Sequence, residues 1–568
     1  MRSARLKEPK IVVAAIDFGT TYSGYAYSFL HDFKKDPLKI LATRVGRGGG
    51  EDKMPTTILF TPNGEFHSFG YDAEDKYAKL VANDMHSGWS HFSRFKMKLH
   101  AQQKIRRAME LTDDQDHKMP AMRVFAEAIK YLKNQLLDSI QEKVSDIQDT
   151  DIHWVLTVPA IWDDGAKQFM REAGNQAGIP DNQLDLALEP EAAAIYCKAI
   201  STKKDGSSFD PGTQFILVDL GGGTADITVH TVEESGNLTE LSPPSGGPWG
   251  GTKVDVAFNT LMEEIYGKSV YSSFNKDNKE DALDIIRDFE EKKRVFKADE
   301  TVTFRVPSAL IAELENSGRT LEKNISGTIY EGKVKQRRDK MHIEGSVISA
   351  LFDDVKKNII QQMKEVLIQH PKVNTILMVG GFSESDIIKQ AVQKAFDLKN
   401  VIIPSEARLA VVKGAVIYGH NPSVIISRSL PYTYGVSVAI GFDDSKHPRS
   451  KLVFKDGFYK CEDNFKVFIR AGDTVIPGKT TVRHVCNASS ATSANIEIYR
   501  TKSKNPIYVD DYGCSCVGSI QLLLSDISSR TTRPIEITMS FGSTELSVQA
   551  NEEQNRNNAV VAKFNFLH

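Results

Sequence analysis

The run Val218-Asp-Leu-Gly-Gly-Gly-Thr224 lies between two β-prone segments and decides the fold class of this chain. The apolar run Phe215 to Val218 precedes it and Asp226-Ile-Thr-Val-His-Thr-Val232 follows it, so the pattern predicts strand, glycine turn, strand. The run Asp17-Phe-Gly-Thr-Thr21 follows the apolar segment Ile11 to Ile16 in the same way. We infer an internal duplication, in which one α/β half is followed by another of similar plan with a cleft between them.

The segments around these two runs alternate between helical and strand patterns. Apolar residues recur at helical spacing in Val124 to Ile140, Lys167 to Ala177, Glu191 to Ile200, Asp281 to Phe296, Val347 to Ile368 and Asp386 to Phe396. Short apolar runs typical of buried strands are Trp154 to Val158, Asp185 to Leu188 and Thr375 to Val379. This alternation predicts an α/β class through about Gly419.

The pattern changes near Leu430. The β-prone runs that follow are separated by Gly, Pro, Asp and Asn turns, and they are Val436 to Ile440, Lys451 to Phe454, Phe465 to Ile469, Ala494 to Tyr499, Ile520 to Leu524, Ile535 to Ser540 and Glu545 to Val548. Such runs favour a separate all-β domain. We therefore expect an α/β domain over residues 10–420, a linker at 421–430, a β-sandwich at 431–553 and a tail at 554–568.

The composition is that of a globular protein with several domains. The chain has 568 residues, which at about 150 residues per domain is room for about three or four. Lys and Arg number 71 against 74 Asp and Glu, so the net charge of −3 draws the chain neither to nucleic acid nor to an anionic membrane. No run of about 18 apolar residues offers a membrane span. We expect partners to be chosen by local sites.

Cysteine usage indicates a reducing compartment. The five cysteines are sparse and odd in number, which argues against a disulfide framework. Cys514 and Cys516 have one residue between them and no second pair nearby, so ordinary strand residues are the stronger interpretation and a metal or redox pair the weaker one. The apolar run at Ile11 is too short for a signal core. The expected location is the cytoplasm, with the nucleus also open.

The glycine turns carry the first functional signal. Backbone N–H groups bind phosphate at close range, and glycine lets the chain approach where a side chain would block it. Gly221, Gly222 and Gly223 provide such a turn, and the hydroxyl of Thr224 lies beside it. Neither turn has the Lys followed by Ser or Thr of a Walker loop, which disfavours P-loop and kinase functions. We expect a nucleotide whose phosphates lie between the two turns.

Two aspartates end the matching strands of these turns. Asp17 precedes the hydroxyls of Thr20 and Thr21, and Asp219 precedes that of Thr224. Because a carboxylate repels phosphate, we interpret Asp17 and Asp219 as outer ligands of Mg²⁺ that act through water. Two ordinary hairpins with aspartate turn residues are the alternative.

A third signal is the run Met378-Val-Gly-Gly-Phe382, a strand that ends in paired glycines before a helix. It suits a nucleoside that lies over Gly380 and Gly381, near a helix N-terminus. Three residues of the predicted helix Asp281 to Phe296 share one polar face that would clamp an adenosine, and they are Glu290, Lys293 and Arg294. A solvated charged face is the open alternative.

Five motifs occur in the order found in the 70-kDa heat-shock protein chaperones, which this chain resembles. They are Asp17-Phe-Gly-Thr-Thr-Tyr22, Thr157-Val-Pro-Ala160, Glu189-Pro-Glu-Ala-Ala-Ala194, Val218-Asp-Leu-Gly-Gly-Gly-Thr224 and Val379-Gly-Gly381. The resemblance is strong over residues 10–420 and weak in the β domain. Three further runs are similar to the divergent heat shock 70 kDa protein 12 branch of this family: Phe95-Lys-Met-Lys-Leu-His100, Thr157-Val-Pro-Ala-Ile-Trp162 and Ala187-Leu-Glu-Pro-Glu-Ala192.

The resemblance implies an actin-like, ribonuclease H-like ATPase domain of two lobes around a deep cleft, followed by a β-sandwich that holds peptide segments. It implies ATP or ADP with Mg²⁺ as cofactors, and client proteins and nucleotide-exchange factors as partners. The residues that would contact the nucleotide are Asp17, Gly19, Thr20, Thr21 and Tyr22 in the first loop, Gly221, Gly222, Gly223 and Thr224 in the second, and Gly250, Gly251, Gly380, Gly381 and Phe382 around the nucleoside.

For catalysis, the resemblance implies a small set of polar side chains. Lys96 resembles the lysine that orients the attacking water and stabilises charge on the transferred phosphoryl group. The residues that would position water and metal are Glu189, Asp219 and Asp226, with Thr224 beside them. Pro159 is similar to the family's interlobe switch residue, and Lys167 stands where a switch arginine is expected.

The chain departs from the family pattern in three places. Phe382 and Glu384 stand where a small hydroxyl residue and a base-stacking arginine are usual, so the adenine contact is expected to be remodelled. The linker reads Ser423-Val-Ile-Ile-Ser-Arg-Ser-Leu430, and its Arg428 in place of acidic residues puts domain docking and J-protein coupling in question. No amphipathic helical lid is expected before His568, and a sandwich without a lid should release peptides quickly.

Three functions stay open on this reading. The first is an ATP-binding, chaperone-like protein that slowly hydrolyses ATP–Mg²⁺ and thereby switches a β-sandwich that binds protein segments. The second is a nucleotide-sensing scaffold with negligible turnover. The third is a small-molecule kinase on the same two-lobed fold, which the all-β accessory domain and the lack of an identifiable sugar-binding acid disfavour.

Overall fold

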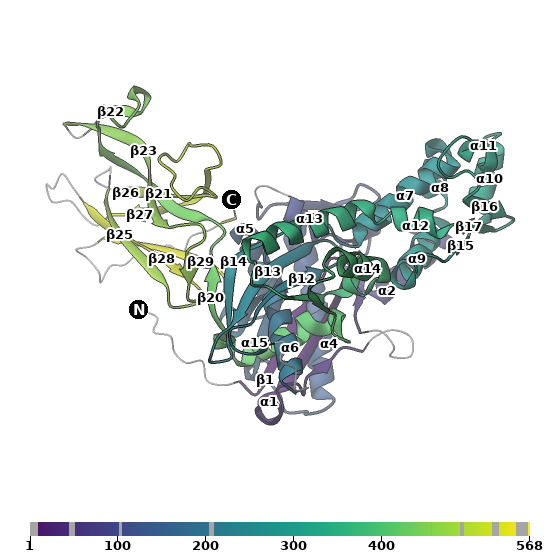
Figure 1. The fold of residues 1–568 in the computed structure, drawn as a ribbon, viewed down its shortest axis with the longest axis horizontal. Coiled ribbons are helices and arrows are strands. Elements are labelled where there is room, and N and C mark those ends of the chain that lie inside the picture. Colours follow the sequence, from purple (N-terminus) through teal and green to yellow (C-terminus); the bar gives the residue numbers. More distant parts are fainter. Residues whose placement is uncertain are drawn as a thin grey trace.

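The computed structural model describes residues 10–44, 52–101, 105–203, 209–455, 457–488, 493–524, 533–542, 544–552 and 566–567. Figure 1 shows an α/β region in the centre, a helical extension at its far end around α10 and α11, and a β-rich region on the opposite side. The chain belongs to the mixed α/β class up to α15, and β-strands dominate after it.

The first sheet contains the strand that ends at Asp17. Its order is β11-β10-β1-β2-β3, with β4 paired to β2. β1 runs parallel to β10 and antiparallel to β2, and every residue of β1 is buried because helices cover both faces of the strand. The strands are β1 Val12–Asp17, β2 Tyr22–Phe29, β3 Leu41–Ala42, β4 Met54–Pro55, β10 Ile152–Val158 and β11 Leu184–Leu188.

The second sheet repeats this plan. Its order is β19-β18-β12-β13-β14-β20-β24. β12 runs parallel to β18 and antiparallel to β13, as β1 does to β10 and β2, so Asp219 takes the place that Asp17 has in the first sheet. The strands are β12 Gln214–Leu220, β13 Ala225–Val232, β14 Leu238–Gly247, β18 Thr375–Val379, β19 Asn400–Ile402, β20 Ile425–Ser429 and β24 Thr474–Val475.

Two helices, α6 Glu189–Lys203 and α15 Ala410–His420, fill the space between the sheets. Their apolar residues form one core with Val13 of β1 and Leu217 of β12. A Cβ atom at Gly414 would lie 1.6 Å from the carbonyl oxygen of Ala192, so the two helices approach at a point where only glycine fits. This core joins the two halves behind the turns that follow β1 and β12.

The other elements of the α/β region extend each half outward. In the first half they are α1 Leu30–Lys35, β5 Thr57–Phe60, β6 Phe66–Phe69, α2 Tyr71–Ala82, β7 Ser90–Ser93, α3 Met97–Ala101, β8 Glu110–Thr112, β9 Lys118–Pro120, α4 Ala121–Gln141 and α5 Asp164–Gln176. In the second half they are α7 Thr252–Tyr266, α8 Lys268–Asp277, α9 Lys279–Val295, β15 Val302–Arg305, α10 Ser308–Asn316, α11 Leu321–Ile325, β16 Val334–Arg337, β17 Lys340–Ile343, α12 Gly345–Ala350, α13 Asp353–Gln369 and α14 Asp386–Ala395.

The prediction of one continuous helix from Val347 to Ile368 is wrong. The run Val347 to Ile368 forms two helices, α12 and α13, and not one. The break falls at Phe352, which is 0% exposed and stacks on Phe382 with 6.2 Å between ring centroids. Helical periodicity alone carries no sign of this break.

The β-rich region contains two sheets that share an apolar core. The larger has the order β22-β23-β21-β26-β27 and the smaller β25-β28-β29. Tyr434, Ile498, Met539 and Val548 are among the residues buried between them. The strands are β21 Thr433–Gly441, β22 Leu452–Lys455, β23 Phe458–Ile469, β25 Thr481–Asn487, β26 Ser493–Thr501, β27 Ser515–Leu523, β28 Pro534–Phe541 and β29 Leu546–Glu552.

The expected linker contains a strand that the sequence pattern did not predict. β20 pairs in parallel with β14 of the second sheet and antiparallel with β24. The β-rich region is therefore joined to the α/β region by shared backbone hydrogen bonds as well as by the chain itself. The signal was missed because Ile425–Ser429 is short and becomes a strand only through its neighbours.

After α15, the part of the chain that the structure describes contains strands and two short 3₁₀ turns, Pro422–Val424 and Arg449–Lys451, and no α-helix. The described helices also include none that combines the length and the apolar character needed to cross a bilayer. The expected tail at 554–568 lies outside the described residues except for Phe566 and Leu567.

Candidate functional site

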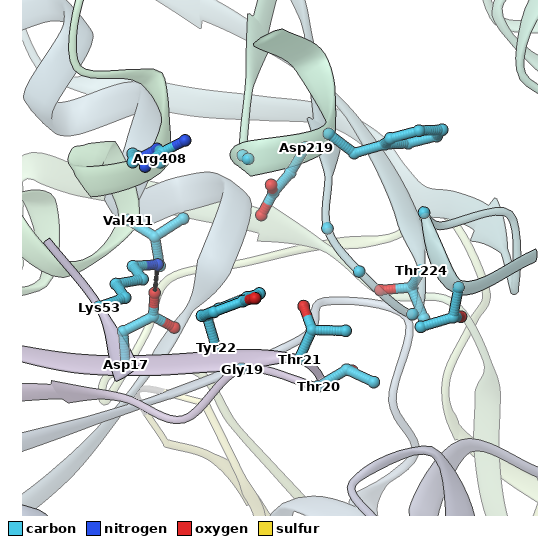
Figure 2. Close-up of a pocket in the computed structure, with 18 of the residues that line it drawn as sticks. Asp17, Gly19, Thr20, Thr21, Tyr22, Lys53, Asp219, Thr224, Arg408 and Val411 are labelled. Atoms are coloured by element: carbon cyan, nitrogen blue, oxygen red, sulfur yellow. Dashed lines mark hydrogen bonds and ion pairs between the residues drawn. The ribbon is translucent and has the colours of Figure 1, made fainter. Parts of the chain in front are cut away.

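A deep cavity lies where the turn after β1 faces the turn after β12. Figure 2 shows Asp17, Thr20 and Thr21 on one wall and Asp219 and Thr224 on the other. The residues that line it are Asp17, Gly19, Thr20, Thr21, Tyr22, Lys53, Lys96, Glu189, Asp219, Gly221, Gly222, Gly223, Thr224, Gly251, Thr252, Glu290, Lys293, Arg294, Gly380, Gly381, Phe382, Arg408 and Val411. The structure thus brings together residues from the whole length of the α/β region.

The two turns approach so closely that the second must be glycine. A Cβ atom at Gly222 would lie 2.3 Å from Oγ1 of Thr21, and one at Gly223 would lie 2.6 Å from Oγ1 of Thr20. Either position would have to move its neighbour to accept a side chain. The turn of the second half is therefore packed against the hydroxyls of the first.

A third glycine segment supports this turn from behind. The backbone N–H groups of Gly250, Gly251 and Thr252 donate to the carbonyl oxygens of Gly223, Gly221 and Gly222 at 3.2, 3.1 and 2.8 Å. In the described part of the chain no backbone hydrogen bond uses the N–H of Gly222 or Gly223. These two donors remain for a ligand in the cavity, which is the requirement of an anion-binding turn.

Asp17 is held in its ionised form by a lysine that sequence reasoning missed. Nζ of Lys53 lies 2.5 Å from Oδ2 of Asp17, and the Thr157 hydroxyl donates to Oδ1 at 2.8 Å. Burial alone would raise the pKa of Asp17, but Lys53, Lys96 and Thr157 together hold that pKa below its usual value. Lys53 therefore places a positive charge beside this carboxylate (Figure 2).

Lys96 and Glu189 form a buried pair on the floor of the cavity. Nζ of Lys96 lies 2.7 Å from Oε1 of Glu189 and 5.1 Å from the ring centre of Trp162. Burial raises the pKa of Glu189 to about 7, against the attraction of Lys96 and with the repulsion of Asp17 and Asp226 adding to the rise. A carboxyl with this pKa changes its charge near neutral pH, as acid–base and water-orienting groups do.

Asp219 and Asp226 add further negative charge nearby. Burial, followed by the charges of Glu189, Asp226 and Asp17, raises the pKa of Asp219 well above its usual value. Burial likewise raises the pKa of Asp226, which accepts the N–H of Ile161 at 3.1 Å. The carboxyl groups of Asp17, Glu189, Asp219 and Asp226 therefore lie close enough to repel one another.

A divalent cation would relieve this repulsion between carboxyl groups. Among the described residues no group of three or more His, Cys, Asp or Glu side chains is arranged to ligate a metal directly. Mg²⁺ usually retains several waters and is held by one or two carboxylates together with phosphate oxygens. Asp17 and Asp219, both lining the cavity from opposite walls, fit that manner of binding.

The predicted clamp on α9 is only partly free to contact a ligand. Nζ of Lys293 forms an ion pair with Asp255 and donates to the carbonyl oxygen of Gly251 at 3.2 Å. The guanidinium of Arg294 lies 4.5 Å from the ring centre of Tyr22. Asp255, on α7, was not predicted, and it fixes the ammonium of Lys293 to the wall of the cavity instead of leaving it as a mobile clamp.

The paired glycines form the opposite edge of the cavity. Gly381 has no atom within 4 Å of its Cβ position, whereas a Cβ at Gly380 would lie 2.5 Å from Oδ1 of Asp219. Nη2 of Arg408 pairs with Oε2 of Glu384 at 2.9 Å. Arg408, from the 3₁₀ turn before α15, thus places an arginine at this edge, although no arginine stands directly after the glycines in the sequence.

Several site residues had no local signal, and some predicted ones lie elsewhere. Lys53, Thr252, Arg408 and Val411 line the cavity only because folding carries their segments there. Asp226 and Gly250 do not line it, and both lie behind the residues that do. Two more predicted residues, Pro159 and Lys167, are also absent from the lining, and Lys167 lines a second cavity where β20 and the β-rich region meet α5.

The family follows from a comparison with family models. The model described as Hsp70 protein matches residues 13–456 of this chain. The chain belongs to the Hsp70 family. The resemblance drawn from the five motifs is thereby confirmed. For this Hsp70 family member, the matched residues include every residue that lines the cavity.

Curated relatives agree with this assignment. The chain is 34% identical to the heat shock 70 kDa protein 12A of Homo sapiens, over 95% of this chain and 89% of that protein. It is 32% identical to the heat shock 70 kDa protein 12B of Homo sapiens, over 98% of this chain and 91% of that protein. It is 26% identical to the chaperone protein DnaK of Thermoplasma volcanium, over 50% of this chain and 43% of that protein. The similarity to the 12A and 12B branch therefore extends through the β-rich region.

Proposed function

We propose that this Hsp70 family member binds ATP with Mg²⁺ in the cavity between the two turns and uses the bound state to control its β-rich region. The observation that carries the proposal is the contact of Gly222 and Gly223 with Thr21 and Thr20, which makes one anion-binding cradle out of two distant segments. Family membership supports the same conclusion. The finer fold, an actin-like two-lobed ATPase domain followed by a β-sandwich, is part of this proposal.

The phosphates are assigned to the two turns. The N–H groups of Gly222 and Gly223 and the hydroxyls of Thr20 and Thr21 donate to phosphate oxygens. Mg²⁺, when bound, neutralises charge on these phosphates. Asp17 and Asp219 would hold its water ligands, and Lys53 keeps Asp17 ionised for that role. Gly19 and Tyr22 complete the wall beside Asp17.

The nucleoside is assigned to the edge formed by the paired glycines. Gly381 leaves an open surface, Gly380 packs closely against Asp219, and Phe382 and Arg408 line the cavity beside them. Glu290, Lys293 and Arg294 line the cavity together with Gly251, and the N–H of Gly250 donates to Gly223 behind the lining. Arg408 takes the part that the resemblance assigns to an arginine after the glycines.

Hydrolysis is assigned to the buried pair on the floor. Lys96 stabilises negative charge on the transferred phosphoryl group, and Glu189 accepts a hydrogen bond from the attacking water. Asp226 acts at one remove, because it accepts the N–H of Ile161 and a hydrogen bond from Thr224, and so positions that hydroxyl. We expect slow turnover, since Lys96 and Glu189 must separate before either contacts water.

We assign the binding of protein segments to the β-rich region. The segment between the two regions is assigned as the linker to the ATPase domain. The proposed units are the ATPase domain at 10–420, the linker at 421–430, the β-sandwich at 431–553 and the tail at 554–568. The pairing of β20 with β14 supports docking of the linker segment against the proposed ATPase domain. In this chain, a buried Arg428 stands in the docked linker where the family usually has an acidic residue.

A nucleotide sensor with negligible turnover is the second candidate. The direct Lys96–Glu189 contact at 2.7 Å favours it, because the two groups neutralise each other in the absence of ligand. Single-turnover hydrolysis distinguishes the candidates. A parent protein that is no faster than its Lys96→Ala and Glu189→Gln variants would be a sensor.

Titration calorimetry with ATP tests the site itself. The parent protein should bind ATP more tightly with Mg²⁺ than with EDTA, and Asp17→Ala should remove most of that difference. Asp444→Ala is the matched control, because the Asp444 side chain is 76% exposed in the β-rich region. Equal Mg²⁺-dependent affinities for the parent and Asp17→Ala would exclude the proposed site.

A further inference from the structure

Two adjacent residues near the end of the printed sequence enter two different cores. Phe566 is 9% exposed and Leu567 is 2% exposed. Phe566 belongs to the apolar core of the β-rich region, whereas Leu567 belongs to the core around β1, β10 and α4. This dipeptide therefore lies at the junction of the two regions and packs into both.

A chain of hydrogen bonds fixes the backbone of the dipeptide to α5. The N–H of Phe566 donates to Oε1 of Gln168 at 2.7 Å. Nε2 of Gln168 donates to Glu172 at 2.8 Å, and Arg107 holds Glu172 with two bonds of 2.7 and 2.6 Å. The amide of Gln168 is thus held with its oxygen toward the backbone N–H of the dipeptide.

The surface of α5 beneath the dipeptide is shaped for a backbone. A Cβ atom at Gly165 would lie 3.6 Å from the carbonyl oxygen of Phe566 and 3.9 Å from Cβ of Ile105. These are ordinary van der Waals distances, so the backbone of Phe566 lies directly against α5 at Gly165.

The same helix also receives the β-rich region through charged groups. The Tyr434 hydroxyl donates to Asp164 at 2.7 Å, and Arg500 pairs with Asp163 at 3.1 Å. Arg171 pairs with Glu545 at 2.6 Å. The side chains of these two ion pairs are 14–27% exposed, so the charged contacts and the apolar dipeptide close this interface together.

We propose that the face of α5 around Gly165 and Gln168 is a binding site for an aromatic–leucine segment, and that Phe566–Leu567 is the ligand it holds in this chain. Bound there, the dipeptide latches the β-rich region to the α/β region. This assignment goes beyond the proposed function, since it requires no nucleotide. An extended segment of a partner protein with the same aromatic–leucine chemistry would compete for the site once the latch opened.

Hydrogen–deuterium exchange on the full chain tests the latch. Leu567→Asp should speed exchange in α5 and in β29 by at least about fivefold and leave the interior of α4 unchanged, because only the interface opens. Leu398→Asp is the matched control, since Leu398 is 92% exposed. Faster exchange in α4 to the same degree would make Leu567 an ordinary core residue and overturn the proposal, as would unchanged exchange in α5.

A peptide supplied in trans tests the site independently. The probe is a fluorescent peptide with the sequence of Val561 to His568. Fluorescence anisotropy should show that the peptide binds the Leu567→Asp protein with a dissociation constant of up to about 1 mM. This is the range expected when a tethered ligand is replaced by a free one. It should bind the intact protein at least about tenfold more weakly, because the site is filled.

The peptide that carries Asp at the position of Leu567 is the control ligand and should not bind. Gln168→Ala should lower the affinity of the original peptide for the Leu567→Asp protein without changing that protein's far-ultraviolet circular dichroism. Equal binding to the intact and variant proteins, or no binding to the variant, would overturn the proposal. ATP binding would be unaffected in either case, so failure here is separate from failure of the proposed function.

Discussion

Arg428 on β20 and Glu191 on the first turn of α6 form a buried ion pair with two N···O distances of 2.6 Å. Glu191 is 1% exposed and Arg428 is 8% exposed. Two residues earlier on the same turn, Glu189 pairs with Lys96 in the cavity. One turn of helix therefore contacts both the proposed catalytic floor and the strand that leads to the β-rich region, which makes it a short physical route between them.

Removal of Arg428 should be strongly destabilising. Arg428→Met leaves Glu191 buried without its partner, and we expect the urea midpoint of the α/β region to fall by the equivalent of about 3–5 kcal/mol. The double variant Arg428→Met with Glu191→Gln should recover much of this loss, because no unpaired charge remains. Lys39→Ala, which breaks an exposed pair with Asp32, is the control and should change little. A double variant no more stable than the single one would contradict the explanation.

Docking of β20 should weaken as the pH rises. Burial, followed by the charge of Glu191, raises the pKa of Glu240 to about 8 from its ordinary value of 4.5, while the Ser429 N–H, Arg428 and Lys167 oppose the rise. Between these two values the folded state retains a proton that the unfolded state has lost. Stability should therefore fall between about pH 5 and 8, by up to about 1.4 kcal/mol per pH unit.

Glu240→Gln removes this titration and should flatten the pH dependence of the urea midpoint relative to the parent protein. The comparison is made between the two proteins at each pH, since Glu189 also titrates in this range. Parallel curves for the parent and the variant would show that Glu240 is ionised in both states and would exclude a protonated Glu240 at the junction.

A single methyl group at the glycine turn should weaken phosphate binding. Gly222→Ala places a Cβ 2.3 Å from Oγ1 of Thr21, which forces the two turns apart. We expect ATP affinity by calorimetry to fall at least about tenfold, or about 1.4 kcal/mol. Gly441→Ala is the control, because no atom lies within 4 Å of its Cβ position. Equal loss in both variants would point to general destabilisation.

Hydrolysis, where it occurs, should depend on the charge of Glu189. Its pKa of about 7 means that the carboxylate form, which accepts from water, becomes populated as the pH rises through 7. The single-turnover rate should rise over that range, and Glu189→Gln should be slower by about a hundredfold or more and insensitive to pH. ATP affinity serves as the internal control, since it should survive the substitution. A parent rate independent of pH would exclude Glu189 as the water-orienting group.

Arg408 should contribute to nucleoside binding. Arg408→Ala is expected to weaken ATP binding by about tenfold if its guanidinium contacts the base. Glu384→Gln removes only the ion pair that Arg408 makes at 2.9 Å and is the matched control. Similar losses in the two variants would indicate that Arg408 merely supports the fold of its turn.

Local sequence patterns were enough to predict the glycine turns and the strands that flank them. Asp17, Gly222 and Thr224 lie at strand ends whose apolar runs and glycines are visible in any window of the chain. The motifs around them were equally sufficient for the family. By contrast, β20 was predicted as a linker and α12–α13 as one helix, because strand pairing and the burial of Phe352 depend on neighbours that are remote in sequence.

The amino-acid order alone settled the class of fold, the family and most of the residues that surround the cavity, because each rests on short-range spacing. The charged partners of those residues became known only from the tertiary structure. Lys53 pairs with Asp17, Asp255 pairs with Lys293, and Arg408 lines the same cavity as the paired glycines. Charges act through space and not along the backbone, so their partners emerge only when the two halves close around one cavity.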